Sequence, residues 1–184
     1  MTSARINAPT EYSADCFVCG RIALADAGQN PEFVARLRTG YVFLNGGRQE
    51  YRGYTLFSST RCVPELHSLN STWQTAFLRE MAAVGHSVFQ AFEPAKLNYA
   101  LLGNGVPHLH WHIIPRYADD PNPQRTIWEG PSPVAIPTVA MGSLRDALLR
   151  ELERTVRDAI EATYKDLRPG LAVKRADSNA DSNP

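Results

Sequence analysis

Apolar residues recur at steps of three and four over residues 71–92, which is the spacing of one face of an α-helix. Asn70 or Ser71 can cap the start of this helix, and Pro94 cannot continue it. A second stripe of the same period follows a capping-box pattern that begins at Ser143. The sequence therefore predicts two helices, with apolar stripes formed by Trp73, Phe77, Met81, Val84, Val88 and Phe92 and by Leu144, Leu148, Leu152, Val156 and Ile160.

Shorter apolar runs predict strands. Residues 40–59 read as a hairpin, because two runs rich in aromatic and branched residues flank glycines at 46, 47 and 53. Residues 97–103 and 108–114 read as two more strands, joined by a turn at Asn104 and Gly105. Since a helix links hairpins rather than single strands, the pattern favours an α+β fold with an antiparallel sheet.

The chain has 184 residues, which is enough for one domain with a core of its own. We expect residues 1–15 to form a flexible polar arm and residues 16–117 to form the main domain. Residues 118–170 begin with a window of five prolines, which predicts an irregular excursion before the C-terminal helix. Residues 171–184 are polar and are expected to be disordered.

Composition narrows the partners and the compartment. Lys plus Arg equals Asp plus Glu, 19 against 19, so no nucleic-acid partner is expected. The first fifteen residues hold no apolar run and no stretch is long enough for a membrane span, so we expect a cytoplasmic protein without a membrane partner. Three cysteines in such a chain argue against a disulfide framework, and the Cys16–Cys19 spacing suggests a metal site or a redox pair.

Three of the five histidines alternate with apolar residues in the segment HLHWHII, residues 108–114. In a strand, His108, His110 and His112 would share one face, and the apolar residues between them would face the core. Imidazoles at this spacing can hold a metal ion. A neutral imidazole can also attack phosphorus while a neighbouring imidazole supports the leaving group. The density of the cluster argues against three ordinary surface histidines.

This segment resembles the signature of the histidine triad family. The segments CFVCG, VFLNGG, RGYTLFSSTRCVPEL and LNYALLGNGV also resemble family segments in the same order, so the resemblance covers roughly residues 16–117 and points to a bacterial zinc-binding branch. It implies a histidine triad fold with an antiparallel sheet of about five strands and a packed helix, here with an added C-terminal helix. It also implies a homodimer in which two sheets join edge to edge.

Members of this family bind nucleotides and hydrolyse or transfer nucleotidyl groups from dinucleoside polyphosphates, nucleoside phosphoramidates or adenylyl conjugates. The resemblance implies that His110 is the nucleophile and forms a covalent nucleotidyl-histidine. His112, as a protonated imidazole, would contact the phosphate and the leaving group. Water would then release an AMP-like product, and no catalytic metal is required.

The resemblance further implies a purine-nucleotide site. Asn45 would contact the ribose hydroxyls, although it can equally be a plain turn residue. Asn104 and the backbone N–H groups of Gly105 and Val106 would contact the phosphates. Asn98 is a weaker phosphate candidate, because a polar residue at a strand edge needs no ligand.

Phe17, Phe43 and Leu44 would line the base pocket, or else serve only as core residues. Relatives often carry Gly-His where this chain has Gly53 and Tyr54, so a fourth histidine is missing here. Relatives also often have a longer glycine-rich loop before the triad.

Zinc-binding relatives complete a four-ligand site with a histidine after the hairpin and the first triad histidine. Here the aligned position holds Cys62, so the implied structural zinc site is Cys16, Cys19, Cys62 and His108, with His67 in reserve. The alternative is that Cys62 is a small buried apolar residue.

Two other functions stay open. The protein could bind purine nucleotides as a sensor or adaptor with little turnover, or the three histidines could hold a catalytic metal. The sequence does not choose the base, the leaving group, or between hydrolysis and phosphorolysis. It also leaves open the effect of Tyr54 and the role of residues 118–142.

Overall fold

The computed structural model describes residues 15–120, 124–129, 138–155 and 174–175. The predicted N-terminal arm, most of the predicted C-terminal tail, and the stripe positions Val156 and Ile160 lie outside these ranges. The proposed division of the chain into segments therefore stays a prediction. Within the described residues, no helix is long and apolar enough to cross a membrane.

The core of the fold is one sheet in which every neighbouring pair of strands is antiparallel. The strand order is β4-β5-β3-β2-β1-β6. The expected antiparallel sheet of about five strands is confirmed, and a two-residue β6 in the tail predicted to be disordered adds a sixth. The strands are β1 (Phe33–Arg36), β2 (Gly40–Leu44), β3 (Thr55–Ser59), β4 (Lys96–Ala100), β5 (His110–Arg116) and β6 (Lys174–Arg175).

Three helices of the described part of the chain pack against the sheet: α1 (Phe17–Asp26), α2 (Ser71–Phe92) and α3 (Thr138–Thr155). The predicted helix over 71–92 is confirmed, and the Asn70 side chain accepts a hydrogen bond from the backbone N–H of Trp73 as its cap. Helix α3 begins before the predicted cap at Ser143, which therefore lies inside the helix. Short 3₁₀ turns occupy Gly46–Arg48 (η1), Leu66–Ser68 (η2) and Ile127–Glu129 (η3).

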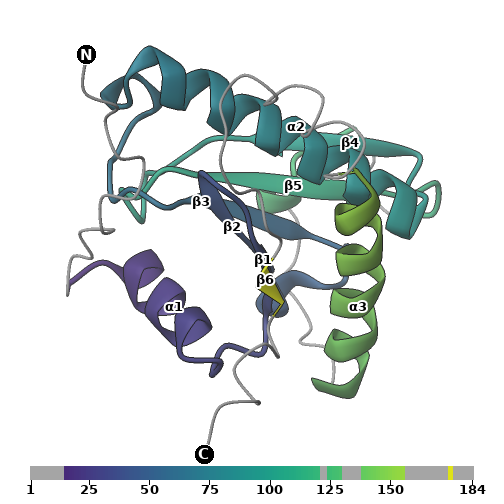
Figure 1. Cartoon of the computed structure of the whole chain (residues 1–184). Helices are drawn as coiled ribbons and strands as arrows, with labels where there is room; N and C mark the ends of the chain where they lie inside the picture. The colour runs from purple at the N-terminus through teal and green to yellow at the C-terminus, as the bar shows by residue number, and fades with distance from the viewer. Residues whose placement is uncertain (1–14, 121–123, 130–137, 156–173, 176–184) are drawn as a thin grey trace, which may run out of the picture.

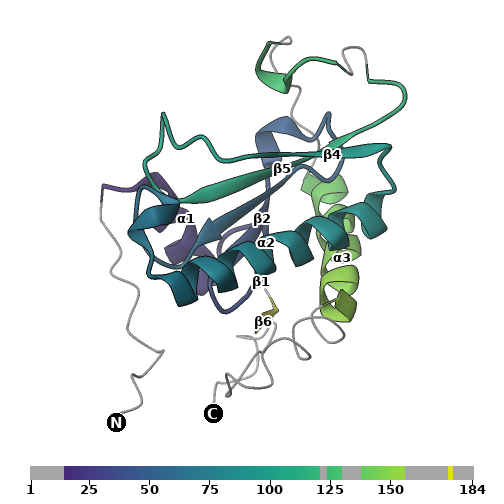
Figure 2. The same cartoon turned by 90° about the horizontal axis from the view of Figure 1, so that it is seen from above.

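The helices divide between the two faces of the sheet. Figure 1 shows α2 above the sheet and α1 below it, and Figure 2 shows α3 crossing α2. Side chains alternate along β2, so Val42 and Leu44 join the core with α2 and α3, whereas Tyr41 and Phe43 pack with α1. All five residues of β2 are buried because both faces of this strand are covered.

The same alternation of side chains decides which face of the sheet carries the histidines of β5. β5 lies between β3 and β4, and its His110 and His112 pair with Ser58 and Leu56 of β3. Ile113 is buried in the core beneath α2, as predicted for the apolar face of this strand. His110 and His112 therefore project from the opposite face, on the side of the sheet where α1 lies.

Candidate active site and metal cluster

A cavity of about 480 Å³ lies between α1 and the face of the sheet that carries His110 and His112. One part of its wall is apolar and comes from helix, strands and the loop before β5. The apolar lining residues are Phe17, Val18, Leu24, Phe43, Leu56 and Val106. The polar part comprises Arg21, Asn30, Glu32, Asn45, Ser58 and the two histidines. An apolar slot beside a polar end is the usual form of a site for an amphipathic small molecule.

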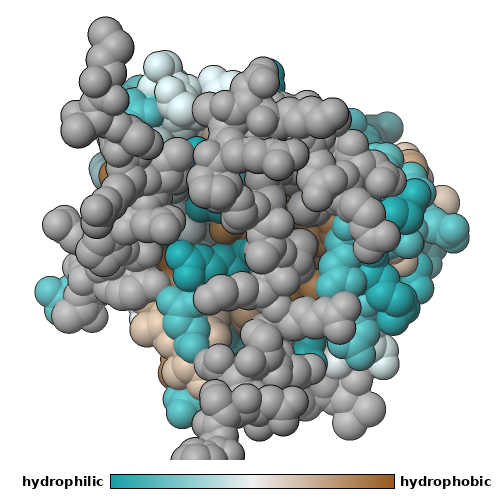
Figure 3. All heavy atoms as spheres, in the orientation of Figure 1, coloured by the Kyte–Doolittle hydropathy of each residue, from teal (hydrophilic) through white to brown (hydrophobic). Residues whose placement is uncertain are grey.

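Two apolar side chains of α1 are exposed to solvent at this site. Phe17 is 65% exposed and Leu24 is 46% exposed, although both line the cavity. Apolar colouring reaches the molecular surface over α1, at the lower left of Figure 3. A planar apolar group could therefore insert between α1 and Phe43 and bury these side chains.

The ring of His110 is held in one tautomer. Its Nδ1 lies 2.5 Å from the backbone carbonyl oxygen of His108. Since a carbonyl can only accept, Nδ1 carries the proton and donates it. Nε2 is left with the lone pair, on a side chain that lines the cavity. This is the form of imidazole that can attack an electrophile.

The ring of His112 is held by a tyrosine. Tyr54 stands where the resemblance implied a fourth histidine, and its hydroxyl lies 2.7 Å from Nδ1 of His112. Burial raises the pKa of Tyr54 to about 12, although a hydrogen bond with the Asn45 side chain acts to lower it. The phenol is therefore protonated at neutral pH. Asn45, Tyr54 and His112 form a continuous polar chain.

His112 is neutral at physiological pH. Burial lowers its pKa to about 4, together with a smaller electrostatic effect of the neighbouring His110. This differs from the protonated imidazole that the resemblance implied. The exposed Trp128 ring also lies nearly perpendicular to the His112 ring, with ring centroids 5.6 Å apart.

The structure brings together part of the predicted nucleotide site. Phe43, Asn45 and Val106 line the cavity with the two histidines, and so does Phe17. Leu44 does not, because alternation along β2 turns it into the core on the α2 side. The remaining three residues are not among the lining residues: Asn104 and Gly105 are exposed in the loop before β5, and Asn98 accepts a hydrogen bond from Arg116.

Sequence reasoning missed the contribution of α1 beyond Phe17. Arg21 forms a close ion pair with Glu32 and stands 4.8 Å from the centre of the Phe43 ring. Glu32 in turn accepts a hydrogen bond from the backbone N–H of Gly46, next to Asn45. The ion pair therefore connects the helix to the loop that carries Asn45.

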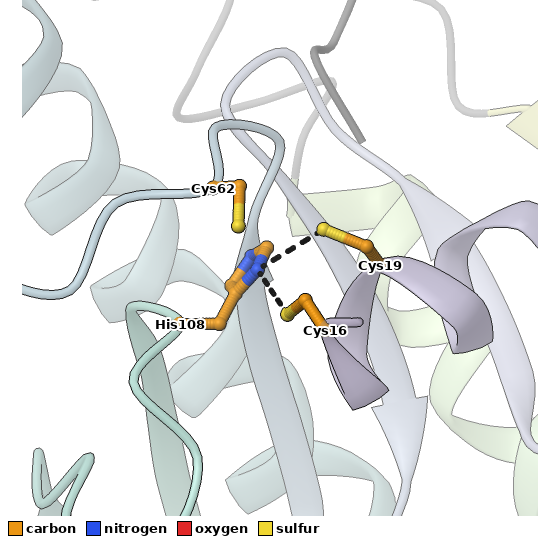
Figure 4. Close-up of side chains that lie close together, drawn as sticks. All are labelled: Cys16, Cys19, Cys62 and His108. Atoms are coloured by element: carbon orange, nitrogen blue, oxygen red, sulfur yellow. Dashed lines mark hydrogen bonds between the residues drawn. The ribbon is translucent and has the colours of Figure 1, made fainter. Parts of the chain in front are cut away.

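The second feature of the site is a cluster of three cysteines and a histidine. The ligand atoms of Cys16, Cys19, Cys62 and His108 all lie within 4.8 Å of one another, so the cluster could hold a metal ion. Figure 4 shows the three sulfurs around the His108 ring. The reserve candidate His67 is exposed and is not part of this cluster.

The geometry fits a tetrahedral ion. Nδ1 of His108 lies 3.5 Å from the Cys16 sulfur and 3.6 Å from the Cys19 sulfur. Metal–ligand distances of about 2.3 Å for sulfur and about 2.0–2.1 Å for nitrogen give a separation of about 3.6 Å at the tetrahedral angle. Nε2 of His108 donates to the carbonyl oxygen of Ser59 at 2.8 Å, which leaves Nδ1 free to bind an ion.

Two pKa shifts in the cluster favour the ligand forms that bind a cation. Burial lowers the pKa of His108, which keeps its imidazole neutral. Burial acts to raise the pKa of the Cys16 thiol, but hydrogen bonds with Cys19, Val18 and Cys62 together lower it below its ordinary value. A thiolate and a neutral imidazole are the ligand forms that metal ions require.

Comparison with known proteins agrees with this geometry. The HIT domain profile matches residues 32–119. The structure is similar to a histidine triad protein from Bradyrhizobium japonicum and to another from Marinobacter aquaeolei. Both are 26% identical with a TM-score of 0.59, and each alignment covers 91% of the other chain. The alignments cover 66% and 67% of this chain, respectively.

A histidine triad nucleotide-binding protein from Sulfolobus tokodaii shares the fold at 16% identity, with a TM-score of 0.62 over 83% of this chain and all of the other. A search of curated proteins gave no match. Residues 32–119 therefore match the histidine triad domain, and the fold is similar to that of solved histidine triad proteins.

We expect the ligand-free His112 ring to stay neutral from pH 8 down to about pH 5 and to gain a proton only near pH 4, because burial disfavours its charged form. Histidine side-chain signals in two-dimensional NMR, followed over this range, measure the midpoint. His112→Gln identifies the signal, and His86→Gln identifies that of an exposed imidazole on α2 for comparison. A midpoint for His112 above pH 6 would contradict the burial argument.

Proposed function

We propose that the protein is a hydrolase or transferase of nucleotidyl groups and acts through a covalent intermediate on His110. The observation that supports this most is the hydrogen bond from Nδ1 of His110 to the His108 carbonyl, which leaves Nε2 as a nucleophile at a cavity wall. The cavity also has the apolar and polar parts that a nucleotide needs. The substrate is a purine nucleotide joined to a leaving group through its α-phosphate.

In the first step, Nε2 of His110 attacks the α-phosphorus. A P–N bond forms while the bond to the leaving group breaks, and the electron pair departs with the leaving group. Nδ1–H continues to donate to the His108 carbonyl and supports the positive ring. Water then attacks phosphorus, the P–N electron pair returns to Nε2, and the water proton passes to solvent.

His112 contributes as a neutral donor. The Tyr54 hydroxyl can donate to Nδ1 of His112, and the Asn45 amide can donate to the Tyr54 oxygen. Nε2 of His112 then carries the proton and faces phosphate oxygens, which accept. If Nδ1 of His112 carried the proton instead, the lone pair of Nε2 would face the anionic phosphate and be repelled by it. A bound phosphate therefore favours the tautomer with the proton on Nε2.

A neutral His112 restricts the kind of leaving group that the site can assist. A hydrogen bond from neutral His112 suffices for a group that departs as an anion, such as a nucleoside polyphosphate. An amine needs a proton, and in the ligand-free protein, where burial lowers the pKa of His112 to about 4, this side chain holds none at neutral pH. Dinucleoside polyphosphates are therefore the first substrates to test.

The proposed placement of the nucleotide follows the cavity. The base lies between the apolar side chains of α1 and Phe43, and Asn45 meets the ribose. The α-phosphate faces both His110 and His112, whose rings lie side by side with centroids 4.9 Å apart. The tri-histidine metal alternative has less support, because the His108 side chain turns toward the cysteines instead.

Mixing the protein with diadenosine tetraphosphate and quenching within one turnover should give a protein mass increased by one adenylyl group. His110→Ala should abolish this adduct, because it removes the only imidazole assigned as nucleophile. The control is His86→Ala, an exposed histidine on α2, which should form the adduct normally. Saturable nucleotide binding without adduct or turnover would instead support the sensor function.

We also propose that the cysteine–histidine cluster holds structural zinc, as in the zinc-binding branch of the family. Three sulfurs and one imidazole are a common ligand set for zinc, and the set is closed, with no position reserved for a substrate. Cys16 directly precedes α1, Cys62 follows β3 and His108 precedes β5, so the ion would tie three segments together.

Protein purified without an affinity tag should contain about one zinc per chain by elemental analysis. Cys62→Ala should lower both the zinc content and the temperature of unfolding, because it removes one of four ligands. His67→Ala serves as a control, since this exposed histidine is not part of the cluster. Wild-type protein that contains no metal and gains no stability from added zinc would contradict the proposal.

We further propose a cytoplasmic homodimer. Among the described residues, β4 pairs only with β5, so its other edge is open to a second sheet. Tyr99 on β4 and Leu102 just after it are 45% and 47% exposed. Joining two such edges would cover these side chains and the open backbone groups.

Sedimentation equilibrium at micromolar concentration should give the mass of a dimer. Asn98→Pro on β4 should shift the protein toward monomer, because proline removes a backbone donor and disturbs strand pairing. Leu78→Ala, an exposed apolar residue on α2, controls for the loss of surface hydrophobicity. A wild-type protein that stays monomeric at these concentrations would contradict the proposed dimer.

A further inference from the structure

Helix α1 belongs to two sites at once. Cys16 precedes its first turn and Cys19 lies within that turn, and both sulfurs point to His108 in Figure 4. Phe17, Arg21 and Leu24 of the same helix line the cavity. One helix therefore contributes both the Cys16 and Cys19 end of the metal cluster and one wall of the proposed nucleotide pocket.

The two ends of α1 are attached differently. Its later turns pack through Ile22 and Ala25 in a cluster with Phe33 and Tyr41, and the Tyr41 hydroxyl donates to Asp26 at 2.9 Å. The first turn has no side-chain cap and no acidic residue to stabilise it. Its attachments include Val18 in the same packed cluster and the two cysteines, so we expect ligation to decide how firmly Phe17 is placed.

The cluster also reaches the nucleophile. The side chain of His108 faces the cysteines, and its backbone carbonyl accepts the hydrogen bond from His110. The backbone N–H of Leu109, next in the chain, donates to the carbonyl of Val63, next to Cys62. Fixing the His108 ring therefore also fixes the carbonyl that selects the His110 tautomer.

We infer that Cys16, Cys19, Cys62 and His108 are positioning residues for the nucleotide site, so that the metal ion and the nucleotide each strengthen the binding of the other. The ion would hold the first turn of α1 against the sheet, and this turn carries the wall that the nucleotide contacts. Conversely, a nucleotide that packs against Phe17 would hold Cys16 and Cys19 in place for the ion. Such linkage is reciprocal by thermodynamic necessity. The inference rests on the proposed nucleotide and metal sites.

The size of the effect follows from general values for coupled sites. Coupling between two binding sites typically changes each affinity by roughly 5–150-fold. Because α1 is also held by its own packing, we expect an effect toward the lower end, about 5–20-fold. An effect of this size is measurable in both directions.

The first experiment measures release of zinc from the zinc-loaded wild-type protein to an excess of a chromophoric chelator, with and without saturating AMP. AMP binding is established beforehand by calorimetry. We expect AMP to slow zinc release several-fold. The control Leu78→Ala should behave as wild type, whereas Phe17→Ala, which keeps all four ligands, should lose most of the effect of AMP. Unchanged zinc release in protein shown to bind AMP overturns the inference.

The second experiment uses Cys62, which is a ligand but does not line the cavity. Cys62→Ala should weaken AMP binding by about 5–20-fold when zinc is present. In metal-free protein, wild type and Cys62→Ala should bind AMP equally, because the ion through which Cys62 acts is absent. A difference that persists without metal would mean an ordinary packing defect and would overturn the coupling.

The possible outcomes distinguish failure of this inference from failure of the proposed nucleotide and zinc sites. If AMP does not bind at millimolar concentration, the proposed nucleotide site fails and the inference fails with it. If AMP binds and diadenosine tetraphosphate forms the adduct on His110, but AMP does not change zinc release, only the inference fails. Should metal-free protein unfold, the zinc-release measurement on folded wild-type protein still decides the matter.

Discussion

The site depends on one constraint, the alternation of side chains along β5 between two antiparallel neighbours. Pairing with β3 and β4 fixes the register of this strand, so a slip by one residue would turn His110 and His112 into the core. Ile113 opposes such a slip, because its burial beneath α2 would be lost. Packing on one face of β5 thus places the imidazoles on the other.

The residues at the start of β5 belong to both the metal cluster and the cavity. His108 offers its ring to the cysteines and its carbonyl to His110, and Tyr54 takes the place of a histidine beside His112. The three histidines of the motif therefore differ in surroundings, although they are equivalent in sequence pattern. Their environments separate them into a candidate ligand, a candidate nucleophile and a neutral donor.

Hydrophobic periodicity and the histidine motif were enough to predict much of the fold and of the candidate site. The features that they did not predict were missed for physical reasons. The α2 stripe and the shared face of His110 and His112 followed from simple periodicity. Helix α1 was not predicted, although Val18, Ile22 and Ala25 have helical spacing, because its apolar residues surround the helix and face both cavity and sheet. Its pocket residue Arg21 was missed for the same reason. The low pKa of His112 depends on burial, which is a property of the folded chain alone.

The exposed apolar side chains of α1 have a thermodynamic consequence. Water that contacts Phe17 and Leu24 in the empty protein is released when a ligand covers them, and burial of apolar surface lowers the heat capacity. The enthalpy of association should therefore become more negative on warming. A polar, phosphate-dominated contact alone would not give this slope, so calorimetry at two temperatures reports how much of the ligand lies against the helix rather than against the histidines.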